Sequence, residues 1–179
     1  NRFATACGFS PRTRLDLVLN DFVASAISSK KIQILSNGMP WRPLIHVEDM
    51  ARVLDWSSSR NPKYGGNFLI VNSGSNKWNY TIKDLSLAVK KELTNVNIFI
   101  NEDAEPDKRS YKVDFSLLKN LAGNYYPKIS IEETVRGLLD GLKKIDFKDK
   151  NFRESDLIRL KVLKGHMDNK RLSNNLEWI

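Results

Sequence analysis

The sequence predicts an α/β fold, and three observations support that prediction. Short apolar runs alternate with longer segments in which apolar residues recur at helical spacing. Clusters rich in Gly, Pro, Asn and Ser separate the two kinds of segment. One run, 68–71, is apolar throughout, which is typical of a strand buried on both faces of a parallel sheet. Strands and helices that alternate in this way indicate the α/β class.

In the first part of the chain, each predicted element follows from apolar spacing and turn signals. Leu15, Leu19 and Phe22 recur at helical spacing, and Asn37-Gly38 marks a turn after an apolar strand. Glu48 and Asp49 suit the first turn of a helix, where the helix dipole favours acids. The predicted elements are a strand at 3–7, a helix at 15–28, a strand at 32–35, a strand ending near 47, a helix at 48–54, a loop at 57–66 and a strand at 68–71.

In the second part of the chain, two helix starts carry capping residues. Thr81 is a good N-cap, and Ser130-Ile131-Glu132-Glu133 is a capping box. The predicted elements are a helix from about 82 to 93, a strand at 96–100, a loop at 101–108, a strand at 111–113, a helix at 116–121, a helix from 131 to about 142 and a weak helix at 154–164.

Length and composition are those of an ordinary globular chain. The 179 residues, 41% hydrophobic and 28% charged, exclude wholesale disorder and leave room for a sizeable core. The apolar runs are too short to span a membrane. A single cysteine, Cys7, and two distant histidines exclude a disulfide framework and leave little for a metal site. We therefore expect a reducing, cytoplasmic compartment and no bound metal.

The net charge of +8 and the pI of about 9.6 admit anionic partners. Such partners include nucleic acid, an anionic membrane and phosphorylated small molecules. No block of five like charges occurs, and the excess is spread along the chain. A solvated basic surface accounts for this pattern, so nucleic acid is not the favoured partner.

Catalytic signatures are absent from these 179 residues. The sequence has no Gly-x-Gly-x-x-Gly or Walker A motif, no Gly-x-Ser-x-Gly elbow and no Tyr-x-x-x-Lys pair. It also has no initiator Met and no signal peptide, and an apolar run opens at residue 3. We therefore expect the chain to be part of a longer protein.

Two arginines stand out as candidate ligand-binding residues. Arg42 lies between Trp41 and Pro43 at the edge of a predicted strand, and Arg109 ends a loop that leads into another. The planar guanidinium suits bidentate binding of phosphate. On spacing alone, an exposed salt bridge with a nearby acid is the better explanation of either residue.

Four segments in order resemble one known family. They are 2–8, similar to Arg-aromatic-x-x-x-Tyr-Gly-Pro; 42–51, similar to Arg-x-x-Ile-His-Val-x-Asp-hydrophobic-Ala; 68–75, similar to a strand ending in Asn-x-Gly-Ser; and 107–116, similar to Asp-x-Arg…Asp-x-Ser. Together they resemble the extended short-chain dehydrogenases/reductases, and among these the NAD-dependent nucleotide-sugar epimerases and dehydratases. Cys7 departs from the family's usual Tyr.

The resemblance implies a fold, a domain division and a function. Residues 1–145 would be the back half of such an enzyme, the C-terminal portion of a Rossmann-type parallel sheet with the small α/β substrate-binding lobe. Residues 146–179 would be a polar, partly helical extension. The glycine motif and the catalytic Tyr-x-x-x-Lys would lie in the front half, so this chain would bind the diphosphate of a nucleotide sugar without catalysing a reaction alone. The alternative is a non-catalytic basic module of the same superfamily that binds RNA or a protein.

The resemblance also assigns roles to particular residues. Arg42 and Arg109 match the arginines that clamp the diphosphate, and Asn20 matches an asparagine that contacts the same group. Phe3 and Thr5 fall where the family lines its NAD and sugar pocket. Structural alternatives stay open: a solvent-facing position for Asn20 and plain strand packing for Phe3 and Thr5. Two further residues, His46 and Cys7, are expected to pack rather than react, as are Trp41 and Trp78.

Two expectations concern geometry and assembly. If Arg42 and Arg109 clamp one diphosphate, they should meet on one concave surface, each partly exposed or paired with an acid such as Asp107. The strand at 3–7 would lack the sheet neighbours that the front half supplies. An unpaired strand edge promotes association, so a homo-oligomer is possible.

Overall fold

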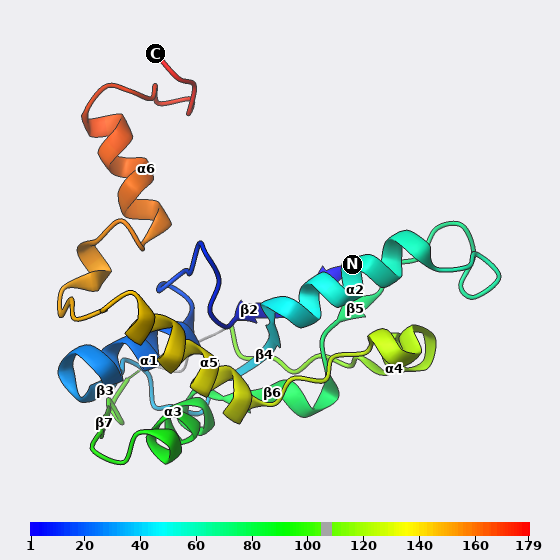
Figure 1. The fold of residues 1–179 in the computed structure, drawn as a ribbon, viewed down its shortest axis with the longest axis horizontal. Helices are drawn as coiled ribbons and strands as arrows, with labels where there is room; N and C mark the ends of the chain where they lie inside the picture. The colour runs from blue at the N-terminus through cyan, green and yellow to red at the C-terminus, as the bar shows by residue number, and fades with distance from the viewer. Residues whose placement is uncertain (105–108) are drawn as a thin grey trace.

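The computed structural model describes residues 1–104 and 109–179. Its helices and strands are shown in Figure 1. They are β1 (Arg2–Phe3), β2 (Thr5–Cys7), α1 (Val18–Ser29), β3 (Lys31–Ile34), β4 (Trp41–His46), α2 (Val47–Ser59), β5 (Asn72–Ser73), β6 (Asn79–Thr81), α3 (Ile82–Glu92), β7 (Asn97–Ile100), α4 (Ser116–Ala122), α5 (Ile131–Lys144) and α6 (Arg159–Asp168), with 3₁₀ turns at Asn76–Trp78, Gly123–Tyr125 and Phe152–Glu154.

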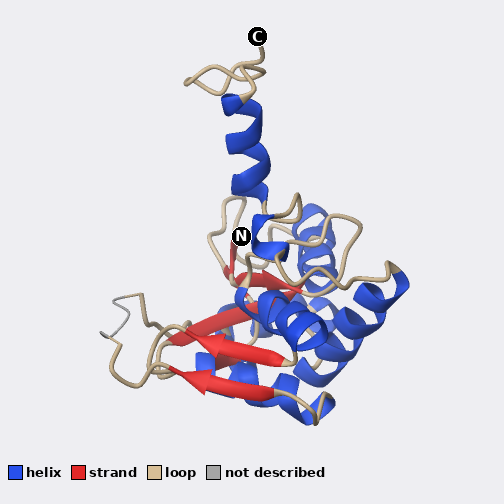
Figure 2. Cartoon of the chain, turned by 90° about the vertical axis from the view of Figure 1, so that its left-hand side faces the viewer, coloured by secondary structure: helices blue, strands red, loops and turns tan. Residues whose placement is uncertain are grey.

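The strands pair mostly in parallel and mostly with distant segments. β4 lies between β2, which is parallel to it, and β6, which is antiparallel. Two further parallel pairs join β1 to β5 and β3 to β7. Figure 2 shows strands and helices as separate layers. The arrangement confirms the predicted α/β class, and its parallel pairs match those of a Rossmann-type sheet.

Two apolar clusters hold the elements together. The larger one joins α1, α3 and α5 to the strands and includes Leu19, Leu85 and Leu138, all fully buried. The smaller one lies between α2 and α4 and includes Val53 and Leu118. The predicted capping box of Ser130 with Glu133 forms, and the predicted N-cap Thr81 forms a second box with Asp84. Because each box satisfies two backbone N–H groups, α3 and α5 begin where the sequence places them.

A buried carboxylate connects α2 to the start of α5. Asp49 is 1% exposed and pairs with Arg52 one turn later. Its oxygens also accept hydrogen bonds from the backbone N–H groups of Lys128, at 3.1 and 3.2 Å, and of Ile129, at 3.1 Å. A buried carboxylate is costly unless it is paired and hydrogen-bonded. Asp49 therefore fixes the segment before α5 against α2.

The prediction of a strand at 68–71 is wrong. Phe68 is 83% exposed and Ile70 is 50% exposed, whereas Val71 is buried. The run therefore has one buried side, and the strand that pairs with β1 is Asn72–Ser73. A short apolar run does not reveal by itself which of its residues will lie beside another strand.

The prediction of a strand at 111–113 is also wrong, because side chains take the place of a partner strand. The amide of Asn79 donates to the Val113 carbonyl at 3.0 Å and accepts from the Val113 N–H at 2.9 Å. Asn76 Oδ1 accepts from the Phe115 N–H at 2.7 Å. These bonds satisfy an extended backbone without a β-ladder.

Three helix boundaries also differ from the prediction. α1 begins at Val18 rather than 15. α2 continues past residue 54 into the first positions of the predicted loop and ends at Ser59, where the hydroxyls of Ser57 and Ser59 donate back to the carbonyls of Val53 and Asp55. α6 lies about four residues later than expected. The predicted loop at 101–108 falls partly outside the described residues.

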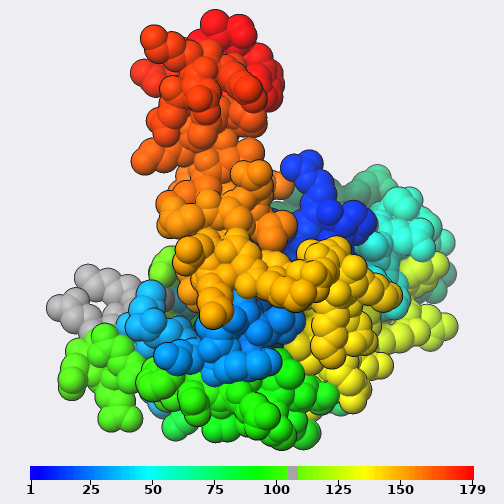
Figure 3. Space-filling model, turned by 60° about the vertical axis from the view of Figure 1, so that its left-hand side comes forward, coloured from blue at the N-terminus to red at the C-terminus, as the bar shows by residue number. Residues whose placement is uncertain are grey.

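The C-terminal segment has two parts. Phe147 and Phe152 are buried in the larger cluster. From α6 onward the chain stands out from the body, as Figures 1 and 3 show. In this part Leu160 and Trp178 are exposed, and Trp178 packs edge-on against His166. Within residues 1–104 and 109–179, no helix is long and apolar enough to cross a membrane.

Candidate nucleotide-binding site

The structure brings Arg42 and Arg109 together. Arg42 lies in β4, and its Nη1 donates to the backbone carbonyl of Trp41 at 2.8 Å and to that of Arg109. Arg42 is half-buried, whereas Arg109 is exposed. The Arg42 side chain therefore contacts the backbone of a segment 67 residues away in the chain. That the two guanidinium groups share one ligand stays a prediction. Asp107, the acid proposed as a partner, lies outside the described residues.

Trp41 is the residue against which the Arg109 segment lies. The backbone N–H of Trp41 donates to Ser110 Oγ at 3.0 Å, and its backbone carbonyl accepts from the Tyr111 N–H at 3.4 Å. The Lys112 ammonium lies 3.7 Å from the centre of the indole ring. This cation–π contact and the two hydrogen bonds place residues 109–112 beside the start of β4. Trp41 therefore serves packing, as expected.

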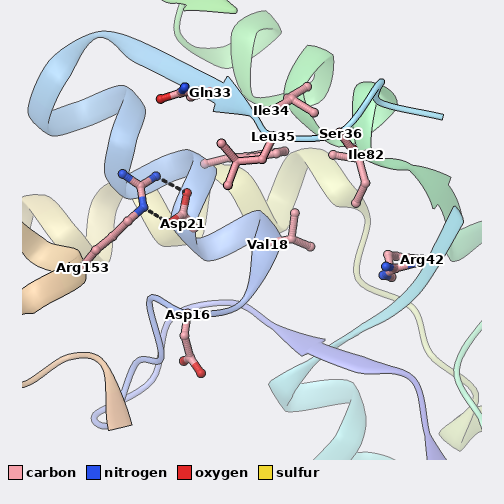
Figure 4. A pocket seen from close by; sticks show the side chains of 11 residues that line it. Asp16, Val18, Asp21, Gln33, Ile34, Leu35, Ser36, Arg42, Ile82 and Arg153 are labelled. Atoms are coloured by element: carbon pink, nitrogen blue, oxygen red, sulfur yellow. Dashed lines mark hydrogen bonds and ion pairs between the residues drawn. The ribbon is translucent and has the colours of Figure 1, made fainter. Parts of the chain in front are cut away.

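Arg42 also lines a pocket of about 620 Å³. Figure 4 shows the pocket with Arg42 at one side and the Arg153–Asp21 pair at the other. Apolar side chains, Val18 and Leu35 among them, lie between these two ends. The full lining is Asp16, Val18, Asp21, Phe22, Gln33, Ile34, Leu35, Ser36, Arg42, Ile82 and Arg153. A volume of this order suits a small organic ligand rather than a single ion.

Both carboxylates in the pocket wall are paired with arginines. Arg14 donates two hydrogen bonds to Asp16, at 2.6 and 3.1 Å. This contact lowers the pKa of Asp16, so the carboxyl is ionised and the pair is close to neutral. Arg153 binds both oxygens of Asp21, at 2.7 and 2.9 Å. The acids therefore do not oppose the binding of an anion beside Arg42.

Asn20 lies near this site but holds the protein rather than facing the pocket. It is 2% exposed, and its Oδ1 accepts from the Gly8 N–H at 3.0 Å. Its Nδ2 donates to the carbonyls of Arg14, at 2.9 Å, and Gly8, at 3.4 Å. The solvent-facing alternative is wrong. In this structure the amide connects α1 to the turn that follows β2.

Phe3 and Thr5 are half-buried in β1 and β2. Phe3 packs against the smaller cluster with Val53 and Trp56. Thr5 lies opposite Leu44 of β4. Neither residue lines the large pocket.

His46 and Cys7 occupy packed positions, as expected. His46 is 7% exposed, and its Nδ1 accepts from the Glu48 N–H at 3.2 Å, which caps α2. Burial lowers the pKa of this imidazole. The Cys7 thiol is 1% exposed and donates to the Ile45 carbonyl at 3.4 Å. Burial raises the pKa of the thiol, so it stays protonated and unreactive.

Sequence reasoning missed Asp21 and Arg153. Asp21 lies in the first turn of α1, where an acid has an ordinary structural explanation. Arg153 belongs to the extension, 132 residues away, and nothing in the sequence pairs the two. No group of three or more metal-ligating side chains occurs among the described residues.

Comparison with known proteins identifies the family resemblance. Residues 2–72 match the model of the NAD dependent epimerase/dehydratase family. The fold is shared with an NAD-dependent NDP-hexosamine 5,6-dehydratase involved in tunicamycin biosynthesis: TM-score 0.65, 17% identity, 84% of this chain and 46% of that one. The predicted resemblance is therefore confirmed. The matched family is NAD-dependent, which agrees with the predicted cofactor, NAD.

Two solved structures from Bacillus cereus have the same fold. UDP-glucuronic acid 4-epimerase, in complex with UDP-glucuronic acid and NAD, has a TM-score of 0.62, 20% identity and coverage of 80% and 44%. UDP-N-acetylglucosamine 4-epimerase has a TM-score of 0.63, 18% identity and coverage of 79% and 47%. The chain thus spans about half the length of each of these three proteins.

Proposed function

We propose that this chain is the substrate-binding part of an NAD-dependent nucleotide-sugar epimerase or dehydratase, and that it binds the diphosphate of an NDP-sugar. The observation that supports this most strongly is the contact of the Arg42 guanidinium with the Arg109 segment at the edge of a 620 Å³ pocket. Two arginines from different segments can share the charge of one pyrophosphate. The family match and the fold support the same substrate class.

The residues of this chain would bind and orient the substrate. NAD, when bound, accepts and returns a hydride, and the protein must place the reacting sugar carbon against the nicotinamide. This chain offers that region Phe3 and Thr5 in β1 and β2, while the glycine-rich turn that binds the dinucleotide is not in these 179 residues. Asn20 would contribute by fixing the turn at Gly8.

Calorimetric titration with an NDP-sugar tests the proposal. Replacing Arg42 with Gln should weaken binding of the NDP-sugar about 10- to 100-fold, because a charged hydrogen-bond donor to the diphosphate is lost. Arg42→Lys should recover only part of the affinity, since an ammonium group cannot make the bidentate hydrogen bonds of a planar guanidinium. Arg171→Gln, an exposed change in the extension, is the matched control.

Two outcomes would contradict the proposal. One is equal binding by the Arg42→Gln and Arg171→Gln chains. The other is turnover of an NDP-sugar by the 179-residue chain with NAD, because the proposal assigns it binding alone and the Tyr-x-x-x-Lys pair is absent.

A further inference from the structure

The pocket beside Arg42 has a polar end that the extension supplies. Arg153 lies in the 3₁₀ turn after the buried Phe147, outside the region that matches the family model. Its Nε and Nη2 bind Asp21, and Nη2 also donates to Ser25 Oγ at 2.9 Å. The guanidinium carbon of Arg153 also lies 4.8 Å from the centre of the Phe152 ring, and Phe152 is 1% exposed. These contacts hold the guanidinium in one orientation at the wall of the pocket.

The orientation of Arg153 leaves one guanidinium nitrogen, Nη1, available to a ligand. Within residues 1–104 and 109–179, the structure gives its Nη1 no partner, and the side chain is 54% exposed. A guanidinium donates hydrogen bonds and accepts none. The group it can receive at this end is therefore a hydrogen-bond acceptor such as a carbonyl oxygen.

The position of the pocket decides which end of an NDP-sugar enters it. With the diphosphate at Arg42, the nucleoside and the sugar extend in opposite directions. Under the proposed function, the sugar reaches the β1–β2 side, where Phe3 and Thr5 lie. The pocket is instead lined by α1 and the turn before it, β3 and the residues after it, β4, α3 and the extension. Its apolar middle, with Val18 and Leu35, suits the faces of a planar base (Figure 4).

We propose that Arg153 determines nucleobase specificity by donating a hydrogen bond to a carbonyl oxygen of the base, with Asp21 and Ser25 as its positioning residues. The inference rests on the proposed function, because Arg42 must hold the diphosphate for the base to reach Arg153. It selects uracil, which presents carbonyl oxygens at its edge, over adenine, which presents none. A hydrogen-bonding site rejects an analogue that lacks the matching group.

Titration of the 179-residue chain with UDP, ADP and inorganic pyrophosphate tests this role. The parent chain should bind UDP about tenfold more tightly than ADP, the effect of one charged hydrogen bond. Arg153→Gln should bring UDP to the affinity of ADP and leave pyrophosphate binding unchanged. Arg153→Lys keeps a cation for Asp21, so the extension stays attached, but it should also lose the preference, because it lacks the second arm of the fork. Arg171→Gln is again the control.

The outcomes separate the two proposals. If Arg42→Gln weakens all three ligands while Arg153→Gln leaves the UDP-to-ADP ratio unchanged, the diphosphate site stands and the role of Arg153 is overturned. A parent chain without preference between UDP and ADP overturns it as well. If pyrophosphate binding does not depend on Arg42, the proposed function itself fails.

Discussion

At the residue scale, Gly8 is a point of close approach between the turn after β2 and His46, the N-cap of α2. Its φ is +105°, and a Cβ built there would lie 2.5 Å from His46 Nε2. The backbone N–H of Gly8 also donates a hydrogen bond to Asn20 Oδ1 at 3.0 Å. A side chain at this position would therefore meet both backbone strain and a buried ring. The turn before the candidate site depends on glycine for close packing.

We expect Gly8→Ala to lower the free energy of unfolding by about 3 kcal/mol, because the imidazole cannot move without leaving the α2 N-cap. Gly137→Ala is the matched control. A Cβ there meets nothing within 4 Å on the exposed side of α5, so this change should stabilise by about 0.5–1 kcal/mol. Urea unfolding monitored by tryptophan fluorescence measures both. Equal stabilities for the two variants would contradict this account.

The sequence was informative about a single residue where its side-chain chemistry and a family-like motif suggested the same role. Arg42 was predicted as a ligand-binding candidate, and its segment does meet that of Arg109. Arg153 could not be predicted, because an exposed arginine in a polar extension gives no signal until its partner Asp21 is known. The burial of Asn20 could not be predicted either, because it depends on a contact with the turn at Gly8, 12 residues earlier, which helical spacing does not show.

At the element scale, asparagine side chains hold residues 113–115, which follow the segment that lies against Trp41. Asn79 makes two hydrogen bonds to Val113, and Asn76 accepts from Phe115. Elements with strong local signals, such as α3 and α5 with their capping boxes, were predicted correctly. The segments at 68–71 and 111–113 were not, because a strand exists only where a partner backbone lies alongside it, and sequence periodicity does not show the partner.

We predict that Asn79→Ala will destabilise the protein by about 2 kcal/mol, since it leaves the N–H and carbonyl of half-buried Val113 without their partners. It should also weaken pyrophosphate binding, because the same segment carries Arg109. Asn120→Ala on the exposed side of α4 should change the stability by less than about 0.5 kcal/mol. Thermal unfolding and calorimetry of the two variants would show the difference, and unchanged unfolding of Asn79→Ala would refute the anchoring role.

At the scale of the whole molecule, the strands at the beginning of the chain are paired on one side only. Among the described residues, β1 pairs with β5 and β2 with β4, and neither has a second neighbour. A strand edge with free N–H and carbonyl groups is a template for another chain. This edge explains why association of copies of the chain is expected.

We therefore expect the isolated 179-residue chain to self-associate in a concentration-dependent way. Light scattering coupled to size exclusion should give a mass that rises above 20.6 kDa as the loading concentration increases. Because the driving contact is backbone hydrogen bonding, added salt should change it little compared with ion-pair association. A constant monomeric mass at high concentration would argue against the edge as an association site.

The hydrogen bonds between the Asp49 carboxylate and the segment before α5 have a consequence for the synthesis of the protein. The N–H groups that bind its carboxylate belong to Lys128 and Ile129, 79 and 80 residues later in the chain. At a synthesis rate of about 5–20 residues per second, they are made roughly 4–16 s after Asp49. During that interval the carboxylate lacks these donors and favours water over burial. Asp49 therefore cannot be buried at full stability during translation until residues 128 and 129 have been made.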